Sequence, residues 1–184
     1  EDYHRARDYY KRATKLDPNF AEAWLGIGIT LQSEERWFEA THYLRKAIEL
    51  DADNAEYWFA LGDAEYHLNN FATAESAYQK VIQMEPDNHE IWLEYSHLLM
   101  VDNRADEAFS LINNGLVFHP NDAELLYRLA CYHYNTNHVN EAYQVLESAL
   151  DKNPDLCHTI FEYAPVMEND SNVLHLIDIY KNRI

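Results

Sequence analysis

The sequence predicts an all-α solenoid of antiparallel helix pairs, because three kinds of residue recur every 34 positions. The aromatic series is Trp24, Trp58 and Trp92, with Leu126 in the next place. The small-residue series is Ala6, Ala40, Ala74, Ala108 and Ala142, and the proline series is Pro18, Pro86, Pro120 and Pro154, with Ala52 in its one gap. A fixed period of this length indicates stacked copies of one supersecondary unit rather than a single globular core.

Each copy is predicted to form two amphipathic helices. In residues 21–54, apolar residues recur at spacings of three and four in two runs, which the polar stretch 32–36 separates. Proline ends a copy, and the Asp or Asn after it can cap the next helix, as in Asp17-Pro18-Asn19. Small residues at Gly28 and Gly62, four places after a tryptophan, predict close approach of neighbouring helices. The full copies are residues 21–54, 55–88, 89–122 and 123–156.

The two ends of the chain depart from this pattern. Residues 1–20 match only the second helix of a copy, which would expose its apolar side, so we expect the natural sequence to begin earlier; a short N-terminal cap is the alternative. Residues 157–184 are predicted to be a degenerate capping helix pair. Its first helix, from Cys157 to Glu168, contains Pro165 and should kink or start late, and its second runs from Val173 to about Arg183. We expect residues 1–184 to form a single solenoid.

The repeated residues resemble those of the tetratricopeptide repeat (TPR) family, in the style of bacterial multi-repeat proteins. Residues 55–88 match it through Trp58, Leu61, Gly62, Ala74, Tyr78, Val81 and Pro86. Departures are local: Glu65, Leu99 and His133 stand where the family has an aromatic residue, and Gly115 replaces an alanine. The resemblance covers all but the last 28 residues, 157–184. It implies a right-handed superhelical solenoid that binds a protein or peptide on a concave surface made by the first helices.

The resemblance also implies which side chains face that concave surface, and these are acidic and aromatic. The predicted partner contacts are Phe59, Asp63, Tyr66, Glu94, His97, Tyr127 and Tyr134. Carboxylates there would engage basic side chains of a partner and the aromatic rings would bind its apolar residues. The predicted partner is therefore a peptide or protein segment with basic residues and apolar anchors.

Each of these residues also has a structural explanation. The aromatic rings can pack between neighbouring repeats instead of binding a partner. Acidic residues in the first turn, such as Glu56 and Glu90, are explained by helix capping and the helix dipole. Asp63 and Glu94 lie in the middle of their predicted helices, where no cap accounts for them, so they are the more informative carboxylates.

Composition and motifs exclude several classes of function. The net charge of −18, from 32 acidic and 14 basic residues, should repel nucleic acid and anionic membranes. No apolar run reaches the roughly 18 residues of a membrane span. The histidines are scattered, and Cys131 and Cys157 have no zinc or redox spacing, so we expect no metal or cofactor and infer no compartment. No phosphate loop or nucleophile elbow occurs, so no enzyme is expected.

The sequence argues against one well-known partner of this family and leaves one alternative role open. Some TPR proteins clamp the C-terminal carboxylate of chaperone tails with basic and Asn side chains, but the matching places here hold residues such as Leu25, Ile29 and Glu90, so this role is rejected. The alternative to peptide binding is a structural segment of a larger protein that self-assembles through its end helices.

Overall fold

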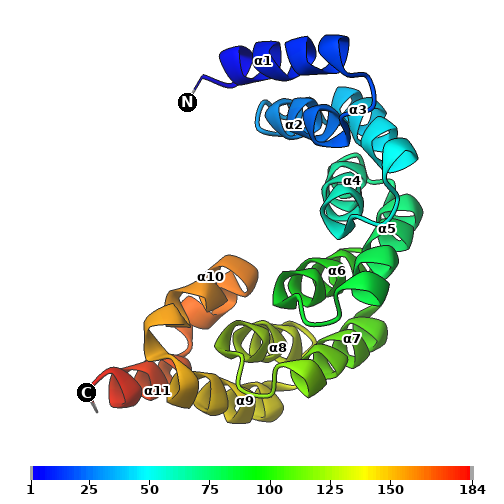
Figure 1. The fold of residues 1–184 in the computed structure, drawn as a ribbon. Coiled ribbons are helices and arrows are strands. Elements are labelled where there is room, and N and C mark those ends of the chain that lie inside the picture. Colours follow the sequence, from blue (N-terminus) through cyan, green and yellow to red (C-terminus); the bar gives the residue numbers. More distant parts are fainter. Residues whose placement is uncertain (1, 183–184) are drawn as a thin grey trace. The chain divides into compact units, whose positions relative to one another are not determined.

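The computed structural model describes residues 2–182, which form helices and no β-strand (Figure 1). The all-α prediction is confirmed. The first helices of the four copies are α2 (Ala21–Gln32), α4 (Ala55–His67), α6 (His89–Val101) and α8 (Ala123–Asn135). The second helices are α3 (Trp37–Leu50), α5 (Phe71–Met84), α7 (Ala105–Phe118) and α9 (Val139–Lys152). The helix before them, α1 (Tyr3–Leu16), has the phase of a second helix.

The turn inside each pair repeats with the same period as the helices. In each turn, the residue two places before the second helix adopts a positive φ of 58–64°. These residues are Glu35, Asn69, Asn103 and Asn137. Asparagine tolerates this left-handed conformation better than other residues with a side chain beyond Cβ. The following amide closes the turn, as where Asn70 N–H donates to the Glu65 carbonyl at 2.9 Å.

Side-chain caps start three of the four first helices, as the junction residues predicted. The Asn54 and Asn88 side chains accept hydrogen bonds from the backbone N–H groups of Glu56 and Glu90 at 3.0 and 3.1 Å. The Asp122 side chain caps α8 by accepting from the N–H of Leu125. α2 is the exception, because Phe20 occupies its cap position and makes no side-chain cap bond.

The tryptophans of the first two copies form hydrogen bonds to the turn that precedes their helix. The indole N–H of Trp24 donates to the Pro18 carbonyl at 2.9 Å, and that of Trp58 donates to the Ala52 carbonyl at 2.8 Å. This bond explains part of the aromatic series, since an indole supplies both an apolar ring and a donor.

The C-terminal pair differs from the expected helix over Cys157–Glu168. That segment divides into a 3₁₀ turn η1 (Pro154–Thr159), a short helix α10 (Ile160–Tyr163) and a second 3₁₀ turn η2 (Pro165–Asn169). Pro165 has no amide hydrogen to continue α10, and Ala164 before it takes an extended φ of −141°. The last helix, α11 (Ser171–Lys181), is capped by Asp170; Arg183, its expected end, lies outside the described residues.

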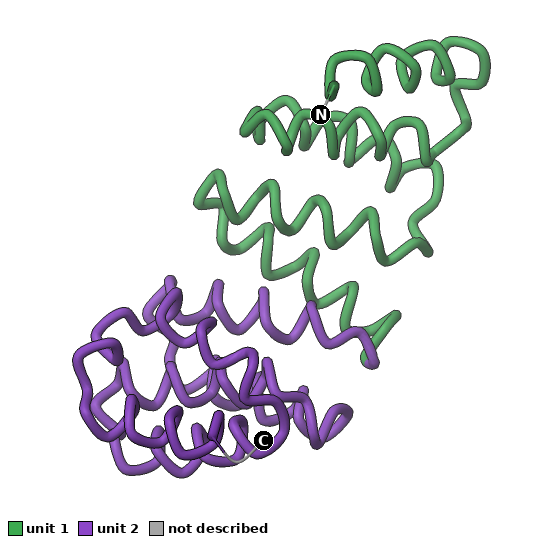
Figure 2. Tube along the Cα trace, turned by 90° about the vertical axis from the view of Figure 1, so that its left-hand side faces the viewer, with its two compact units in different colours: residues 1–86 green, residues 87–184 purple. Residues whose placement is uncertain are grey.

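Contacts within the chain cluster into two compact units, residues 1–86 and 87–184 (Figure 2). In unit 1, Leu44 and Tyr57 are fully buried at the centre of the core. In unit 2, Leu146, Ile160 and Met167 are equally buried, which makes the capping segment part of that core. The expected continuation of both units as one solenoid stays a prediction.

The small residues on the first helices make room for the second helices. A Cβ on Gly28 would lie 2.5 Å from the Leu44 side chain, and one on Gly62 would meet the Tyr78 ring. Ser96 takes the same place on α6, where its hydroxyl is 3.0 Å from the Tyr132 hydroxyl. The expectation of close approach at Gly28 and Gly62 is confirmed. None of the described helices is long and apolar enough to cross a membrane.

Candidate protein-binding surface

The seven residues predicted to contact a partner fall into two groups, one in each unit. Unit 1 holds Phe59, Asp63 and Tyr66 on α4, and unit 2 holds Glu94 and His97 on α6 with Tyr127 and Tyr134 on α8. Within unit 2, α6, α8 and α10 line two adjoining recesses, which we call the acidic face. One recess of about 160 Å³ is lined by Leu93, Glu124, Tyr127, Arg128, Cys131, Thr159, Glu162 and Tyr163. The other, of about 250 Å³, is lined by His97, Met100, Val101, Tyr132, Asn135, Glu162 and Tyr163.

A buried guanidinium lies beneath the acidic face. Arg128 is 6% exposed, and its guanidinium carbon stands 3.4 Å from the centroid of the Tyr163 ring, a cation–π contact. One of its N–H groups points to the Leu93 carbonyl at a long 3.4 Å. Arg128 therefore packs α8 against α6 and α10, which leaves little of its guanidinium for a partner.

The two predicted residues on α6 are half-buried beside this guanidinium. Burial raises the pKa of Glu94 above its ordinary value, while Arg128 acts in the opposite direction. Burial lowers the pKa of His97, and Arg128 lowers it further, so the imidazole is neutral at pH 7. The His97 ring lies 5.6 Å from that of Tyr163, edge to face. His97 thus belongs to the same surface as α10, and Glu94 lies within the electrostatic influence of Arg128.

The two predicted tyrosines on α8 serve the packing of unit 2. Tyr127 is 1% exposed, and its hydroxyl donates to the Asn153 carbonyl at 2.8 Å. The half-buried Tyr134 donates to the Asp170 carboxylate at 2.8 Å, which raises its pKa to about 12. Asp170 also caps α11, so Tyr134 ties α8 to the last helix. Burial and the bond to Asn153 occupy the Tyr127 side chain, so little of it is accessible to a partner.

The three predicted residues of unit 1 are all half-buried on α4. The Tyr78 hydroxyl donates to Asp63 at 2.7 Å, and the Phe59 ring lies 6.0 Å from the Tyr78 ring. Tyr66 packs beside Phe71, with ring centroids 6.0 Å apart. Asp63 therefore has a structural role in joining α4 to α5, in addition to any contact with a partner.

A neighbouring acid in unit 1 explains one departure from the family pattern. Glu65 is only 3% exposed, yet it stands where the family has an aromatic residue. Its carboxylate accepts from Arg45 at 2.5 Å and from the Asn70 amide at 2.8 Å. The carboxylate thus links α3, α4 and the turn that follows, which offsets part of the cost of its burial.

Glu162, Tyr163 and Thr159 line the acidic face from the capping segment, and none of them was predicted as a contact from the sequence. A signal was present, because residues 157–168 keep the phase of a first helix and Glu162 falls at a concave position in that phase. The irregular structure around Pro165 hid how closely this segment covers α8. Among residues 2–182, no group of three His, Cys, Asp or Glu is placed to hold a metal ion.

Comparison with known proteins gives the family. The model of the cytochrome c-type biogenesis protein H TPR domain matches residues 39–156, and a tetratricopeptide repeat model matches residues 1–61. No curated protein matches the sequence.

Solved structures show the same fold. The crystal structure of MamA superposes with a TM-score of 0.74 at 22% identity, covering 82% of this chain and 88% of that one. YrrB, described as a TPR protein with an unusual peptide-binding site, gives a TM-score of 0.67 at 16% identity over 96% of this chain and 93% of its own. At these identities the likeness shows the fold alone. With helix pairs in every copy and a family model spanning most of them, the chain belongs to the tetratricopeptide repeat family.

Proposed function

We propose that this chain is a non-catalytic interaction module that binds a basic peptide segment with apolar anchors on the acidic face of unit 2. The TPR fold supports a role in protein–protein interaction. The finer proposal rests on one observation: the carboxylates of Glu124 on α8 and Glu162 on α10 line one recess, whose guanidinium, that of Arg128, is buried. Glu94 of α6 is half-buried and lies within the electrostatic influence of the same guanidinium.

The carboxylates of this face are available to a basic side chain. Glu94 and Glu162 form no ion pair with any residue from 2 to 182, and Glu162 is exposed. Glu124 is half-exposed, and within the described residues its one ion pair is with the His89 imidazole, at 3.5 Å. A Lys or Arg of the partner would replace part of the water around these groups with a charge-assisted hydrogen bond.

The apolar anchor would enter the second recess. Val101 is 44% exposed there, beside the half-buried Met100 and the ring of Tyr163. A flexible thioether next to aromatic edges accepts apolar side chains of different shapes. This mixture of acids and apolar surface favours an extended or helical segment in which basic and apolar residues alternate. In unit 1, Phe59, Asp63 and Tyr66 form a second, separate group of proposed contacts.

Selection of binders from a random peptide library tests the proposal. With the wild-type chain as bait, we expect the recovered peptides to be enriched in Lys and Arg next to Leu, Met or aromatic residues. The variant Glu94→Lys/Glu162→Lys should bind those same peptides at least tenfold more weakly, because it reverses two charges on the face.

A matched control separates the face from overall charge. Glu141→Lys/Glu147→Lys makes the same charge change at two exposed positions on α9, outside both recesses. It should retain wild-type affinity apart from a small long-range effect that salt screens. Recovery of peptides without basic residues, or equal weakening by both double variants, would contradict the proposal.

A further inference from the structure

One acidic residue after η2 joins three helices of unit 2. The carboxylate of Asp170 accepts hydrogen bonds from the hydroxyls of Tyr134 on α8 and Tyr143 on α9, at 2.8 and 2.6 Å. Both bonds end on the same carboxylate oxygen, and the other oxygen caps α11 by accepting from the backbone N–H of Asn172 at 2.8 Å. Asp170 therefore connects α8, α9 and the start of α11 at one point.

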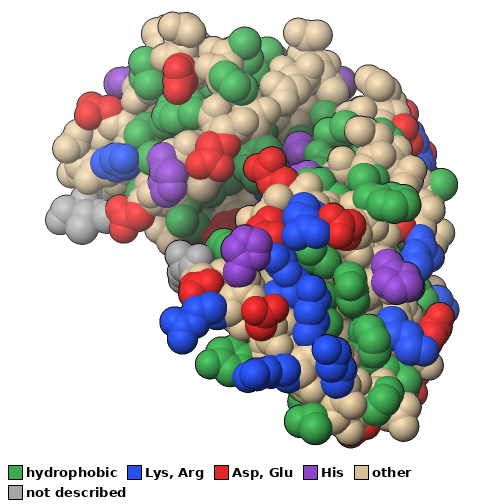
Figure 3. All heavy atoms as spheres, turned by 90° about the horizontal axis from the view of Figure 1, so that it is seen from above, with side chains coloured by type: hydrophobic (Ala, Val, Ile, Leu, Met, Phe, Trp, Pro, Cys, Tyr) green, Lys and Arg blue, Asp and Glu red, His purple; other side chains and the backbone are tan. Residues whose placement is uncertain are grey.

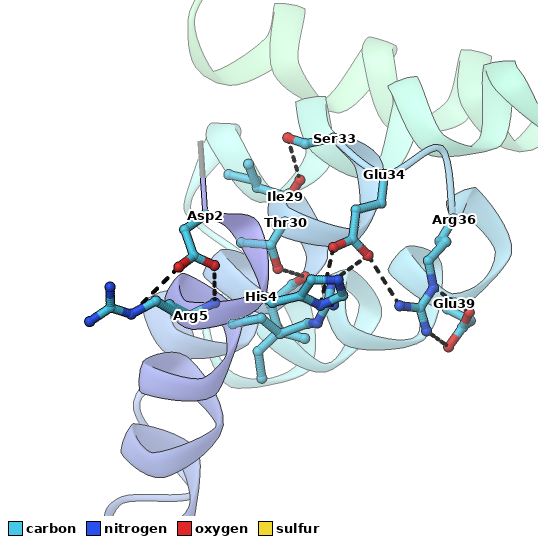
Figure 4. A network of polar contacts seen from close by, with 11 residues as sticks. Asp2, His4, Arg5, Ile29, Thr30, Ser33, Glu34, Arg36 and Glu39 are labelled. Carbon is cyan, nitrogen blue, oxygen red and sulfur yellow. Dashed lines mark hydrogen bonds and ion pairs between the residues drawn. The ribbon is translucent and has the colours of Figure 1, made fainter.

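The same contact occurs in unit 1, in the turn after α2, with different chemistry. Glu34 lies four repeat periods, or 136 residues, before Asp170, and Arg7 lies the same distance before Tyr143. The Glu34 carboxylate accepts from Arg7 at 2.7 Å and from Arg36 at 3.1 Å, the second bond being visible in Figure 4. In both units, a side chain of a second helix thus donates to an acid in the turn position of the following copy.

The two contacts differ in the charge around them. Exposed Lys and Arg side chains gather over α1 (Figure 3), and these are Arg5, Lys11, Arg12 and Lys15. No Lys or Arg occurs in residues 153–180, so neutral phenols are the donors to Asp170. Burial acts to raise the pKa of Asp170, but the hydrogen bonds from Tyr143 and Tyr134 outweigh it, and the pKa lies below its ordinary value. The carboxylate is therefore ionised at pH 7, and bonds to an ionised acceptor are strong.

Backbone hydrogen bonds connect Asp170 to the part of the acidic face that α10 supplies. The N–H of Ala164 donates to the Ile160 carbonyl at 2.7 Å, and the N–H of Met167 donates to the Ala164 carbonyl at 3.0 Å. The N–H of Asp170 then donates to the Met167 carbonyl at 3.2 Å. The two residues that α10 contributes to the acidic face lie inside the first of these turns, so the position of Asp170 constrains theirs.

Apolar burial alone does not fix how α10 lies against α8. Ile160, Ala164 and Met167 are fully buried, but apolar contact is not directional. The first helices of the four copies have 12 or 13 residues, whereas α10 has only four. Its orientation therefore depends on side-chain hydrogen bonds, one from Asn135 to the Tyr163 carbonyl at 2.9 Å and the others those to the carboxylate after η2.

We propose that Asp170 is the positioning residue of the acidic face. By accepting the two phenol hydrogen bonds, its carboxylate holds η2 and α10 in place, so that Glu162 and Tyr163 lie against α8. Asp170 itself lines neither recess, so it acts through α10 rather than by touching the partner. This inference rests on the proposed function for its partner, a basic peptide with apolar anchors, but the effect of Asp170 on α10 can be measured without a partner.

The two cysteines of the chain report on the position of α10. Cys131 on α8 and Cys157 on η1 are both buried, and the Cys131 thiol donates to the Ile160 carbonyl at 3.6 Å. Burial raises the pKa of Cys131 to about 12, which keeps the reactive thiolate scarce. Reaction with an aromatic disulfide reagent that releases a coloured thiolate should be slow, because it requires local opening of the segment over α8.

Two variants remove the hydrogen bonds without touching either recess. Asp170→Asn removes the charge and keeps a residue that can cap α11, and Tyr143→Phe removes one donor. In each, the thiols should react about tenfold faster, because a hydrogen bond to an ionised group is lost. The affinity for a blocked hexapeptide of alternating Lys and Leu, measured by fluorescence anisotropy, should fall about tenfold for the same reason.

The equivalent contact in unit 1 provides the matched control. Glu34→Gln removes one negative charge from the same repeat position, as Asp170→Asn does, but it lies in the other unit. Its thiol rate and peptide affinity should stay within about twofold of wild type, since distant sites act independently. Faster thiol reaction in both variants would indicate general loss of stability and would overturn the proposal.

A rescue variant separates the hydroxyl of Tyr143 from its ring. Tyr143→Arg introduces the residue type found at Arg7, whose guanidinium can donate to the carboxylate in place of the phenol. We expect Tyr143→Arg to keep the slow thiol reaction of wild type and Tyr143→Phe to lose it. If the ring mattered through packing alone, Tyr143→Phe would be tolerated and Tyr143→Arg would not, and the proposal would be wrong.

The two readouts distinguish this proposal from the proposed function. Thiols that react in Asp170→Asn as slowly as in wild type would overturn the role of Asp170. Faster reaction with unchanged peptide affinity would also overturn it, because the acidic face would then not depend on the position of α10. Absence of peptide binding by the wild-type chain would count against the proposed function instead, and the thiol rates would then support or overturn the role of Asp170 by themselves.

Discussion

Helices α1 and α3 are the same element of consecutive copies, and they differ in what covers them. Tyr9 and Leu16 of α1 correspond to Tyr43 and Leu50 of α3, 34 residues later, with the same side chains at both places. On α1 they are exposed, and on α3 they pack against α2 and the core of unit 1. In a repeat protein the sequence of a helix thus defines an interface, while its neighbours decide whether that interface is filled.

The largest expected difference between the two helices is the loss of stability when the side chain that each packs over a glycine of α2 is truncated to alanine. Leu44 of α3 is fully buried over Gly28, whereas Tyr10 of α1, its counterpart, is 39% exposed. Leu44→Ala should lower the free energy of unfolding by about 2–5 kcal/mol, because it opens a cavity in the core of unit 1. Tyr10→Ala should cost clearly less. Urea unfolding of both variants measures this, and equal losses would mean that α1 is packed as firmly as α3.

Two glycine-to-alanine substitutions test the same comparison, because each adds one methyl group where two helices pack closely. In Gly62→Ala the new Cβ meets Tyr78, which is buried and hydrogen-bonded to Asp63, so we expect a loss of about 1–3 kcal/mol. In Gly26→Ala the new Cβ meets the outer atoms of the Tyr10 ring, which can turn toward solvent. The better helix propensity of alanine, about 1 kcal/mol, then offsets most of the clash. Thermal unfolding should rank Gly62→Ala well below Gly26→Ala, and the reverse order would contradict this.

Substitution of Tyr43 on α3 and of its equivalent on α1, Tyr9, should show a smaller difference in stability. Tyr43→Ser removes the stack on Trp24, which is worth about 0.5–1.5 kcal/mol beyond the buried area. Tyr9→Ser changes an exposed residue and should alter stability by no more than about 0.5 kcal/mol. Differential scanning calorimetry of the two variants is the measurement. A large loss of stability for Tyr9→Ser would show that the Tyr9 side chain packs against another part of the chain.

The smallest effect concerns the ion pairs that hold α1 on α2. Hydrogen bonding to Arg7 lowers the pKa of Glu34 below its ordinary value of 4.5. The stabilising contribution of the ionised carboxylate is complete above that ordinary value and is lost as the pH falls through the lowered pKa of the folded state. Acidification below about pH 4.5 should therefore destabilise wild type slightly more than Glu34→Gln, as judged by melting temperatures over a pH series. Parallel curves would exclude this contribution.

The candidate site shows where prediction from the sequence ends. The 34-residue phase predicted that Glu94 and His97 lie on a first helix, and in the structure both are on α6, where they are half-buried. The family resemblance implied that Tyr127 faces the concave side, but it could not show that the Tyr127 hydroxyl donates to the Asn153 carbonyl and that the side chain is buried. The orientation of a ring within a helix face depends on the neighbouring element, which periodicity does not describe.

The sequence alone determined the helix pairs, their caps and the TPR family, because these follow from local rules that each copy repeats: apolar spacing, Asn or Asp at a junction, and glycine at a close approach. Only the tertiary structure decided how the capping segment brings Glu162 and Tyr163 beside α8, and that Tyr127 is buried while Val101 is exposed. Both outcomes depend on which element lies next to which. Packing between segments decides which elements become neighbours. Where the repeat is irregular, the 34-residue pattern is lost and the sequence no longer predicts this packing.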